Sequence, residues 1–207
     1  MDQTLVLETT FTTERGTAVL TDALATGSNE RGLHLGANCP GTLLRVLACT
    51  GGEIQAEVSY APRPEYGLVH PVLVPVPGGL AARGGASRRL LSAPASLDVD
   101  GATATATIRL AVGQAAVFAL GHGELGGPVL APWTTEEITG RLDDTLEGWR
   151  SWSAIHQNYE GPWRELVRHS GRVLQAMTFA PTGAMVVAAP TTSLPETSKQ
   201  WRQPDAT

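Results

Sequence analysis

Acidic side chains are the residues of this chain whose type and spacing best suit acid–base chemistry. Three close pairs are candidates: Glu136 and Glu137, Asp143 and Asp144, Glu160 and Glu165. Two carboxyl groups act as general acid and general base only where their surroundings separate their pKa values. The first pair falls in the first turn of an expected helix, where the helix dipole favours carboxylates for structural reasons. The second is expected on the solvated outer face of that helix, and the third is expected to point in different directions.

Other catalytic and metal-binding patterns are missing from the sequence. The five histidines are scattered, without the spacing of a metal site: His34, His70, His122, His156 and His169. No G-x-S-x-G turn and no phosphate-binding loop occurs. Cys39 and Cys49 are expected to be buried thiols rather than a disulfide or a reactive site. The sequence therefore assigns no catalytic, cofactor-binding or metal-binding residue, and it predicts no cofactor.

Tryptophan is concentrated in one part of the chain. Trp133, Trp149, Trp152 and Trp163 fall within 31 residues, together with Tyr159. Aromatic rings can hold sugar rings, but aromatic residues at helical spacing more often pack in a core. We therefore expect the following side chains to pack on one another or on the rest of the protein: Trp149, Trp152, Trp163, Leu166 and Met177.

The segments that must position these residues begin with a long strand-rich region. From residue 4 to about residue 131, apolar residues alternate with polar or small ones, as in half-buried strands. Stretches such as CTGG and VPVPGGLAARGGAS lie between them and have the composition of turns and loops. Short strands at regular spacing predict a mainly β, antiparallel sandwich rather than βαβ units.

Helical periodicity replaces this pattern in the last third of the chain. Thr134 and Glu137 form a capping-box pattern ahead of apolar residues at steps of three and four, which predicts a helix near residues 135–153. A second helix is predicted over residues 162–179, with Pro162 at its first helical position, where the missing N–H does no harm.

Composition limits the classes of partner. The 207 residues carry a formal net charge of −5, with no run of five like charges. Such a chain has no cluster of basic residues that would attract nucleic acid or an anionic membrane, so we expect neither partner. The start MDQTLVLETT lacks the basic and apolar regions of a signal peptide, and no window approaches about eighteen uninterrupted apolar residues. We expect a cytoplasmic protein.

Long uninterrupted sequence words resemble one enzyme family. GPWRE, APTGA and APTTSLPE, all within residues 159–196, are similar to the start of the catalytic domain of glycoside hydrolase family 15. That family contains glucoamylases and some microbial α,α-trehalases. LVLETTFTT and YAPRPEYGLVHP resemble the amino-terminal β-sandwich of its prokaryotic members. The resemblance covers nearly the whole chain up to Glu196.

The resemblance implies an order of domains. It places an incomplete β-sandwich at residues 1–131, a linker helix at 132–158 and the start of an (α/α)6 catalytic barrel at 159–207. The two carboxyl groups of the inverting mechanism are, in the family, glutamates on later barrel loops, and an Arg-Asp pair that grips the terminal glucose follows APTTSLPE. Neither feature is matched here, and no sugar-binding residue is assigned to the tail TSKQWRQPDAT. We therefore expect a chain truncated at both ends relative to the family and inactive by itself.

Two classes of function stay open on these grounds. The first is a fragment of a family 15 hydrolase of terminal α-glucosidic bonds, in α-glucan, maltose, isomaltose or trehalose. The alternative is a non-catalytic β-sandwich module that binds a carbohydrate or a protein partner. In either case an incomplete sandwich leaves open strand edges, so self-association is expected.

Overall fold

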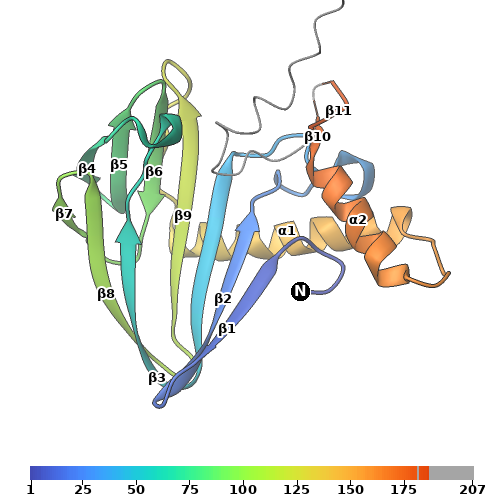
Figure 1. The fold of residues 1–207 in the computed structure, drawn as a ribbon, viewed down its shortest axis with the longest axis horizontal. Helices are drawn as coiled ribbons and strands as arrows, with labels where there is room; N and C mark the ends of the chain where they lie inside the picture. The colour runs from blue at the N-terminus through green and yellow to red at the C-terminus, as the bar shows by residue number, and fades with distance from the viewer. Residues whose placement is uncertain (181, 187–207) are drawn as a thin grey trace, which may run out of the picture.

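In the residues that the computed structural model describes, 1–180 and 182–186, the strand-rich region forms one antiparallel sheet of nine strands (Figure 1). The strands are β1 (Leu7–Thr12), β2 (Gly16–Leu24), β3 (Thr42–Tyr60), β4 (Val72–Val76), β5 (Gly79–Gly84), β6 (Ser87–Ser92), β7 (Asp98–Asp100), β8 (Thr103–Ala111) and β9 (Ala115–Glu124). Two 3-10 turns, η1 (Gly32–His34) and η2 (Glu65–Gly67), lie in the loops that follow β2 and β3. The predicted mainly β, antiparallel fold is confirmed.

The long strand β3 joins two arms of the sheet because its halves pair with different strands. Residues 42–48 pair with β9, and residues 53–60 pair with β8. One arm therefore runs β1-β2-β3-β9-β6-β5-β4, while β8 and β7 form the other. Apolar side chains from both arms meet in one core: Cys49, Tyr60, Leu73, Leu80, Ala82, Leu91, Ala104, Leu110, Ala116 and Phe118. The sheet thus folds over its own apolar face.

Two stretches that were predicted as loops belong to the sheet. CTGG lies inside β3, where Gly52, with φ +63°, lets the strand change direction without ending. VPVPGGLAARGGAS contributes to β4, β5 and β6, which are joined through Gly78 (φ +80°) and Gly85 (φ +65°). Both predictions are wrong, for different reasons. In CTGG the glycines stay within the long strand β3, where they let its path bend. In VPVPGGLAARGGAS, Gly78 and Gly85 occupy tight hairpin turns, so the strands on either side are only five or six residues long.

The first helix, α1 (Thr135–His156), crosses one face of the sheet (Figure 1). The predicted capping box is confirmed: Thr134 Oγ1 accepts from the N–H of Glu137 at 3.2 Å, and Glu137 Oε2 accepts from the N–H of Thr134 at 2.7 Å. The helix and the sheet share a second apolar core: Val6, Ala23, Ala25, Leu44, Val117, Ala119, Ile138 and Leu146. The sheet is therefore covered with apolar contacts on both of its faces.

The second helix, α2 (Arg164–Ala176), begins two residues later than predicted. Trp163 adopts a left-handed conformation with φ 67°, which interrupts the helical path. Pro162 therefore precedes the helix instead of opening it. A short hairpin of β10 (Thr178–Phe179) and β11 (Ala184–Met185) follows, and residues 181 and 187–207, which include APTTSLPE, lie outside the described residues.

Substitution of Gly52 tests the bend in β3. A Cβ atom at this position would lie 2.1 Å from the carbonyl oxygen of Arg15. We expect Gly52→Ala to lower the free energy of unfolding by more than about 3 kcal/mol, because the added carbon meets backbone that moves only if the strands part. Denaturant unfolding followed by circular dichroism measures the loss.

Gly113 provides the matched control, because its φ is +85° and an added Cβ would meet no atom within 4 Å. Gly113→Ala should cost only the penalty of a left-handed backbone, about 1–2 kcal/mol. Equal losses in the two variants would show that close backbone approach at Gly52 does not control stability.

Candidate functional site

The loop between β2 and β3 is built around one buried carboxylate, Glu30. Its residue is only 5% exposed, and its side chain accepts hydrogen bonds from the N–H groups of Gly27 (3.0 Å), Gly36 (2.8 Å) and Asn38. These bonds satisfy a charged group that has left water and tie both ends of the loop to one point. The sequence pattern assigned no role to Glu30, although an acid close to Gly27, Gly32 and Gly36 was an available signal.

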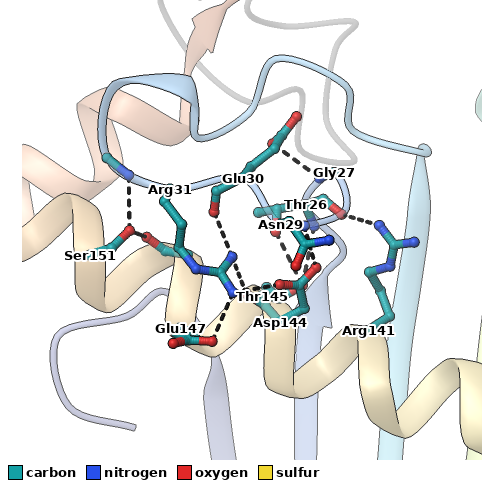
Figure 2. Close-up of polar contacts among 12 residues, drawn as sticks. Thr26, Gly27, Asn29, Glu30, Arg31, Arg141, Asp144, Thr145, Glu147 and Ser151 are labelled. Carbon is teal, nitrogen blue, oxygen red and sulfur yellow. Dashed lines mark hydrogen bonds and ion pairs between the residues drawn. The ribbon is translucent and has the colours of Figure 1, made fainter.

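Asp144 on α1 anchors this loop to the helix (Figure 2). Its two carboxylate oxygens accept from the N–H of Asn29 and from Nη2 of Arg31, both at 2.7 Å. Arg31 also bonds Glu147 at 2.8 Å. Burial favours a raised pKa for Asp144, but the Asn29 N–H and the Arg31 guanidinium outweigh it and hold that pKa below its usual value. The prediction of a solvated acidic pair is therefore right for exposed Asp143 and wrong for Asp144.

Hydroxyl groups on the same side of α1 complete the contact (Figure 2). Thr145 is fully buried, and its Oγ1 accepts from the N–H of Thr26 at 3.2 Å. One turn before it, Arg141 donates to the carbonyl oxygen of Thr26 at 3.1 Å. Farther along the helix, Ser151 Oγ accepts from the N–H of Gly32 at 2.9 Å. The loop is thus held along three successive turns of α1.

A depression of about 640 Å³ lies between this loop and the first half of α1. Several of the groups that line it are already engaged. Glu137 closes the helix cap, Asp144 bonds Arg31, and the Arg141 guanidinium carbon lies 5.6 Å from the centroid of the Trp133 ring. These charged groups serve the helix end and the loop contact.

Glu160 and Glu165 lie together, contrary to expectation. Arg164 bonds Glu160 at 3.1 Å and Glu165 at 3.2 Å, and Arg168 bonds Glu160 at 2.8 Å. The prediction that the two acids point apart is wrong because Glu160 precedes α2 and reaches the same arginines as Glu165. Both acidic side chains are about two-thirds exposed, at 67% and 68%. Carboxylates so exposed and so paired suit a surface ion-pair network.

The tryptophans divide into a buried and an exposed group. Trp149 and Trp152 are 7% and 8% exposed, and they pack in a T-shaped pair, with ring centroids 6.1 Å apart, beside Leu35. The prediction of core packing is confirmed for these two. It is wrong for Trp163 and Leu166, which are 78% and 63% exposed.

The second helix directs its polar side towards the protein. Arg172 is buried and donates to Gln157 Oε1 at 2.9 Å, and Gln175 Nε2 donates to the carbonyl oxygen of Leu35 at 3.1 Å. Most of its large apolar side chains are exposed, together with others just before and after the helix: Trp163, Leu166, Val167, Leu174, Phe179, Met185 and Val186. These seven residues are called the α2 apolar surface below. An exposed apolar surface of this kind marks an interaction site.

Within the described part of the chain, no group of three or more His, Cys, Asp or Glu side chains is arranged to hold a metal ion. Both cysteines are free thiols. Cys49 is buried as predicted, but Cys39 is exposed, so the prediction of a buried thiol is wrong there. Cys39 lies in the loop before β3 rather than on a strand. Neither described helix is long and apolar enough to cross a membrane.

Comparisons with known proteins find trehalase-like sequences. Residues 2–136 match the family described as "Trehalase-like, N-terminal". The chain is 32% identical over 220 residues to a protein named trehalase from Mycolicibacterium smegmatis, and 28% identical over 218 residues to one from Mycobacterium tuberculosis. Each match covers 97% of this chain but only 32% and 31% of the relative, so the chain spans about a third of their length. A trehalase from Thermoplasma acidophilum is 45% identical over 56 residues, or 27% of this chain and 9% of the relative.

Exchange of one carboxylate tests the anchoring of the loop to α1. We expect Asp144→Asn to lower the free energy of unfolding by about 1.5–3 kcal/mol, because two short hydrogen bonds to a charged acceptor are weakened and Arg31 keeps only Glu147 as an acidic partner. Asp143→Asn is the matched control, since Asp143 is exposed and adjacent in the sequence. Denaturant unfolding at pH 7 compares the two variants.

The difference between the protein and Asp144→Asn should also depend on pH. The pKa of Asp144 is lower in the folded protein than in the unfolded chain, so its stabilisation is present above the unfolded value of about 3.9. It is lost as the pH falls below that value and through the folded pKa. A stability difference that stayed constant from pH 7 to about pH 2.5 would contradict this account of the ion pair.

Proposed function

This chain belongs to the trehalase-like N-terminal family, and we propose that it forms the amino-terminal part of a glycoside hydrolase whose substrate is trehalose. The observation that carries the proposal is the family match over residues 2–136, together with trehalases that align over 97% of the chain. The resemblance to glycoside hydrolase family 15 supports an inverting reaction at a terminal α-glucosidic bond. Maltose, isomaltose and α-glucan are the competing substrates within that family.

The chemistry of an inverting hydrolase would come from a catalytic portion to which this chain is joined. Such an enzyme needs one carboxyl group as acid and a second as base, about 6.5–9.5 Å apart across the scissile bond. Acids of the described residues that lie close together serve other purposes: Glu137 caps α1, Asp144 anchors a loop, and Glu160 pairs with arginines. We therefore propose that this chain does not hydrolyse glycosides by itself.

The role proposed for the chain is to hold α2, as the first helix of the catalytic portion, ready for packing against the rest of that portion. In this assignment residues 1–131 are the sandwich, residues 132–158 the linker helix, and residues 159–207 the start of the catalytic portion. An isolated helix of 13 residues is marginal in water, so α2 needs packing for stability. Its polar side is held by the loop and by α1, and burial of each large apolar side chain on its other side would contribute about 1.5–3 kcal/mol. The α2 apolar surface is thus the face expected to be covered.

A second candidate function rests on the same exposed surface. A non-catalytic module that binds a separate protein partner would also use the α2 apolar surface. A sugar platform made of Trp149 and Trp152 is not supported, because both rings are buried. The two candidates differ in whether the covering partner is part of the same hydrolase.

Purified residues 1–207 should release no glucose from trehalose, maltose, isomaltose or soluble starch above the level of a buffer blank. The physical reason is the lack, among the described residues, of an enclosed acid–base pair around a sugar site. Glucose release is measured with a coupled assay, and Glu160→Gln and Glu165→Gln are prepared in parallel. Turnover that is reproducible and lost in either variant would overturn the proposal of inactivity.

A chimaera tests the proposed role of α2. In the Mycolicibacterium smegmatis trehalase, the segment aligned with this chain is replaced by this chain, and trehalose hydrolysis is measured. We expect an active chimaera in which Leu166→Asp reduces the yield of active enzyme about 10- to 100-fold, because the variant buries a charge in place of an apolar group.

His169→Asp is the matched control in the same chimaera, since His169 is exposed on α2 but is not part of the α2 apolar surface. This variant should keep its activity. Full activity of the Leu166→Asp chimaera would contradict burial of this surface by the catalytic portion and would favour the separate binding module.

A further inference from the structure

The folded sheet leaves several strand edges open, and on β1 the protection against pairing is limited to one charged side chain. Edge strands are protected by proline, by charged side chains or by being short. Strand β4 contains Pro75, β7 is a three-residue strand with two aspartates, and the free part of β8 carries Arg109. Strand β1 has six residues, LETTFT, with one charge and no proline. Among the described strands, β1 pairs with β2 alone.

Apolar side chains of β1 are exposed on the face of the sheet opposite α1. Leu7 and Phe11 are 62% and 49% exposed, and they share a face with Thr9 because side chains alternate along a strand. The register of β1 and β2 places these three residues opposite even-numbered residues of β2, whereas Ala23 of β2 packs towards α1. Within the described residues, neither Leu7 nor Phe11 belongs to an apolar core cluster.

The hydrogen-bonding groups on the open side of β1 can be assigned from the hairpin turn. The N–H of Thr13 bonds the carbonyl oxygen of Gly16 across the turn at 2.9 Å. Bonded and non-bonded positions alternate in an antiparallel pair, so Leu7, Thr9 and Phe11 direct their backbone groups towards β2. The backbone groups of the even-numbered residues, among them Glu8 and Thr10, therefore point away from the sheet.

We propose that β1 pairs antiparallel with β1 of a second copy of this chain, with Thr9 on the two-fold axis. In this register Glu8 of one copy faces Thr10 of the other, so the outward backbone groups bond each other. On the side-chain face away from α1, Leu7 of each copy lies opposite Phe11 of the other. This proposal goes beyond the proposed function and does not depend on it.

Two features of the sequence favour this register. It keeps the single charge of β1, Glu8, opposite a threonine rather than opposite the second Glu8. It also forms two aliphatic–aromatic cross-strand pairs, each worth about 0.2–1 kcal/mol. The interface is limited to one short strand from each copy, which places it at the low end of interface sizes, below about 1,200 Å². A weak dimer that depends on concentration is therefore expected.

A charge exchange at the symmetry axis tests the pairing in the full chain. Sedimentation velocity across the micromolar to low millimolar range should show a monomer–dimer equilibrium. Thr9→Lys and Thr9→Glu each place like charges opposite each other, and each should raise the dissociation constant at least about tenfold. An equal mixture of the two variants should restore association, because Lys and Glu then face each other. Circular dichroism confirms that each variant is folded.

Two control variants locate the interface. Thr107→Lys adds the same charge to an exposed position of β8, and Leu166→Gln removes an apolar group from the α2 apolar surface. Neither should change the dissociation constant. A monomer at all concentrations, a dimer insensitive to Thr9, or a dimer lost only in Leu166→Gln would each overturn the proposal.

Disulfide cross-linking of cysteine-substituted variants tests the same pairing if the charged variants fold poorly. In a Cys39→Ser background, Thr9→Cys places two thiols at a non-bonded antiparallel position, with Cα atoms about 4.5 Å apart, within reach of a disulfide. The adjacent variant Thr10→Cys places its thiols beyond about 7 Å, where no bridge forms. Oxidation should give a covalent dimer on a non-reducing gel for Thr9→Cys alone. Equal cross-linking of the two variants would contradict the register.

Discussion

Burial of the Glu30 carboxylate is the constraint on which the arrangement of both helices depends. A buried carboxylate needs hydrogen-bond donors to replace the water that it has lost. Three backbone N–H groups of the same loop donate to Glu30. The loop is held in one shape as a result. In that shape Asn29 and Arg31 face α1, and the carbonyl group of Leu35 faces α2. The contacts of the loop with the two helices follow from this one internal network.

The sheet uses its two faces for different purposes, and β3 makes this possible. Because the two halves of β3 pair with different strands, the sheet closes over one apolar core and still offers its outer face to α1. The bend at Gly52 requires a residue without a side chain, since the backbone of Arg15 approaches closely there. The first helix therefore packs as a layer on the sheet, fixed by apolar contacts along one side and by the loop along another.

Helix α2 is held in place by its polar side chains, which leaves its apolar side chains free to contact another surface. Helices on a protein surface usually bury their apolar side and expose their polar side. In α2 the buried residue is Arg172, and its hydrogen bond to Gln157, just after α1, and that of Gln175 to the loop come from long polar side chains. Such contacts hold a helix in place without using its apolar side chains. The α2 apolar surface is thereby left available, as the interface with a larger hydrolase would require.

The sequence by itself determined the elements whose signals are local. Alternation predicted the antiparallel strands, and the Thr134–Glu137 pair predicted the start of α1, because both depend on neighbouring residues along one chain segment. LVLETTFTT and YAPRPEYGLVHP, which resemble the amino-terminal sandwich of prokaryotic hydrolases, lie within residues 2–136, which match the trehalase-like N-terminal family. Tertiary structure alone decided that Asp144 anchors a loop, that Glu30 is buried, and that Trp152 is covered while Trp163 is exposed. These outcomes depend on which segments meet in space, and Asn29 and Asp144, 115 residues apart, carry no local signal of their contact.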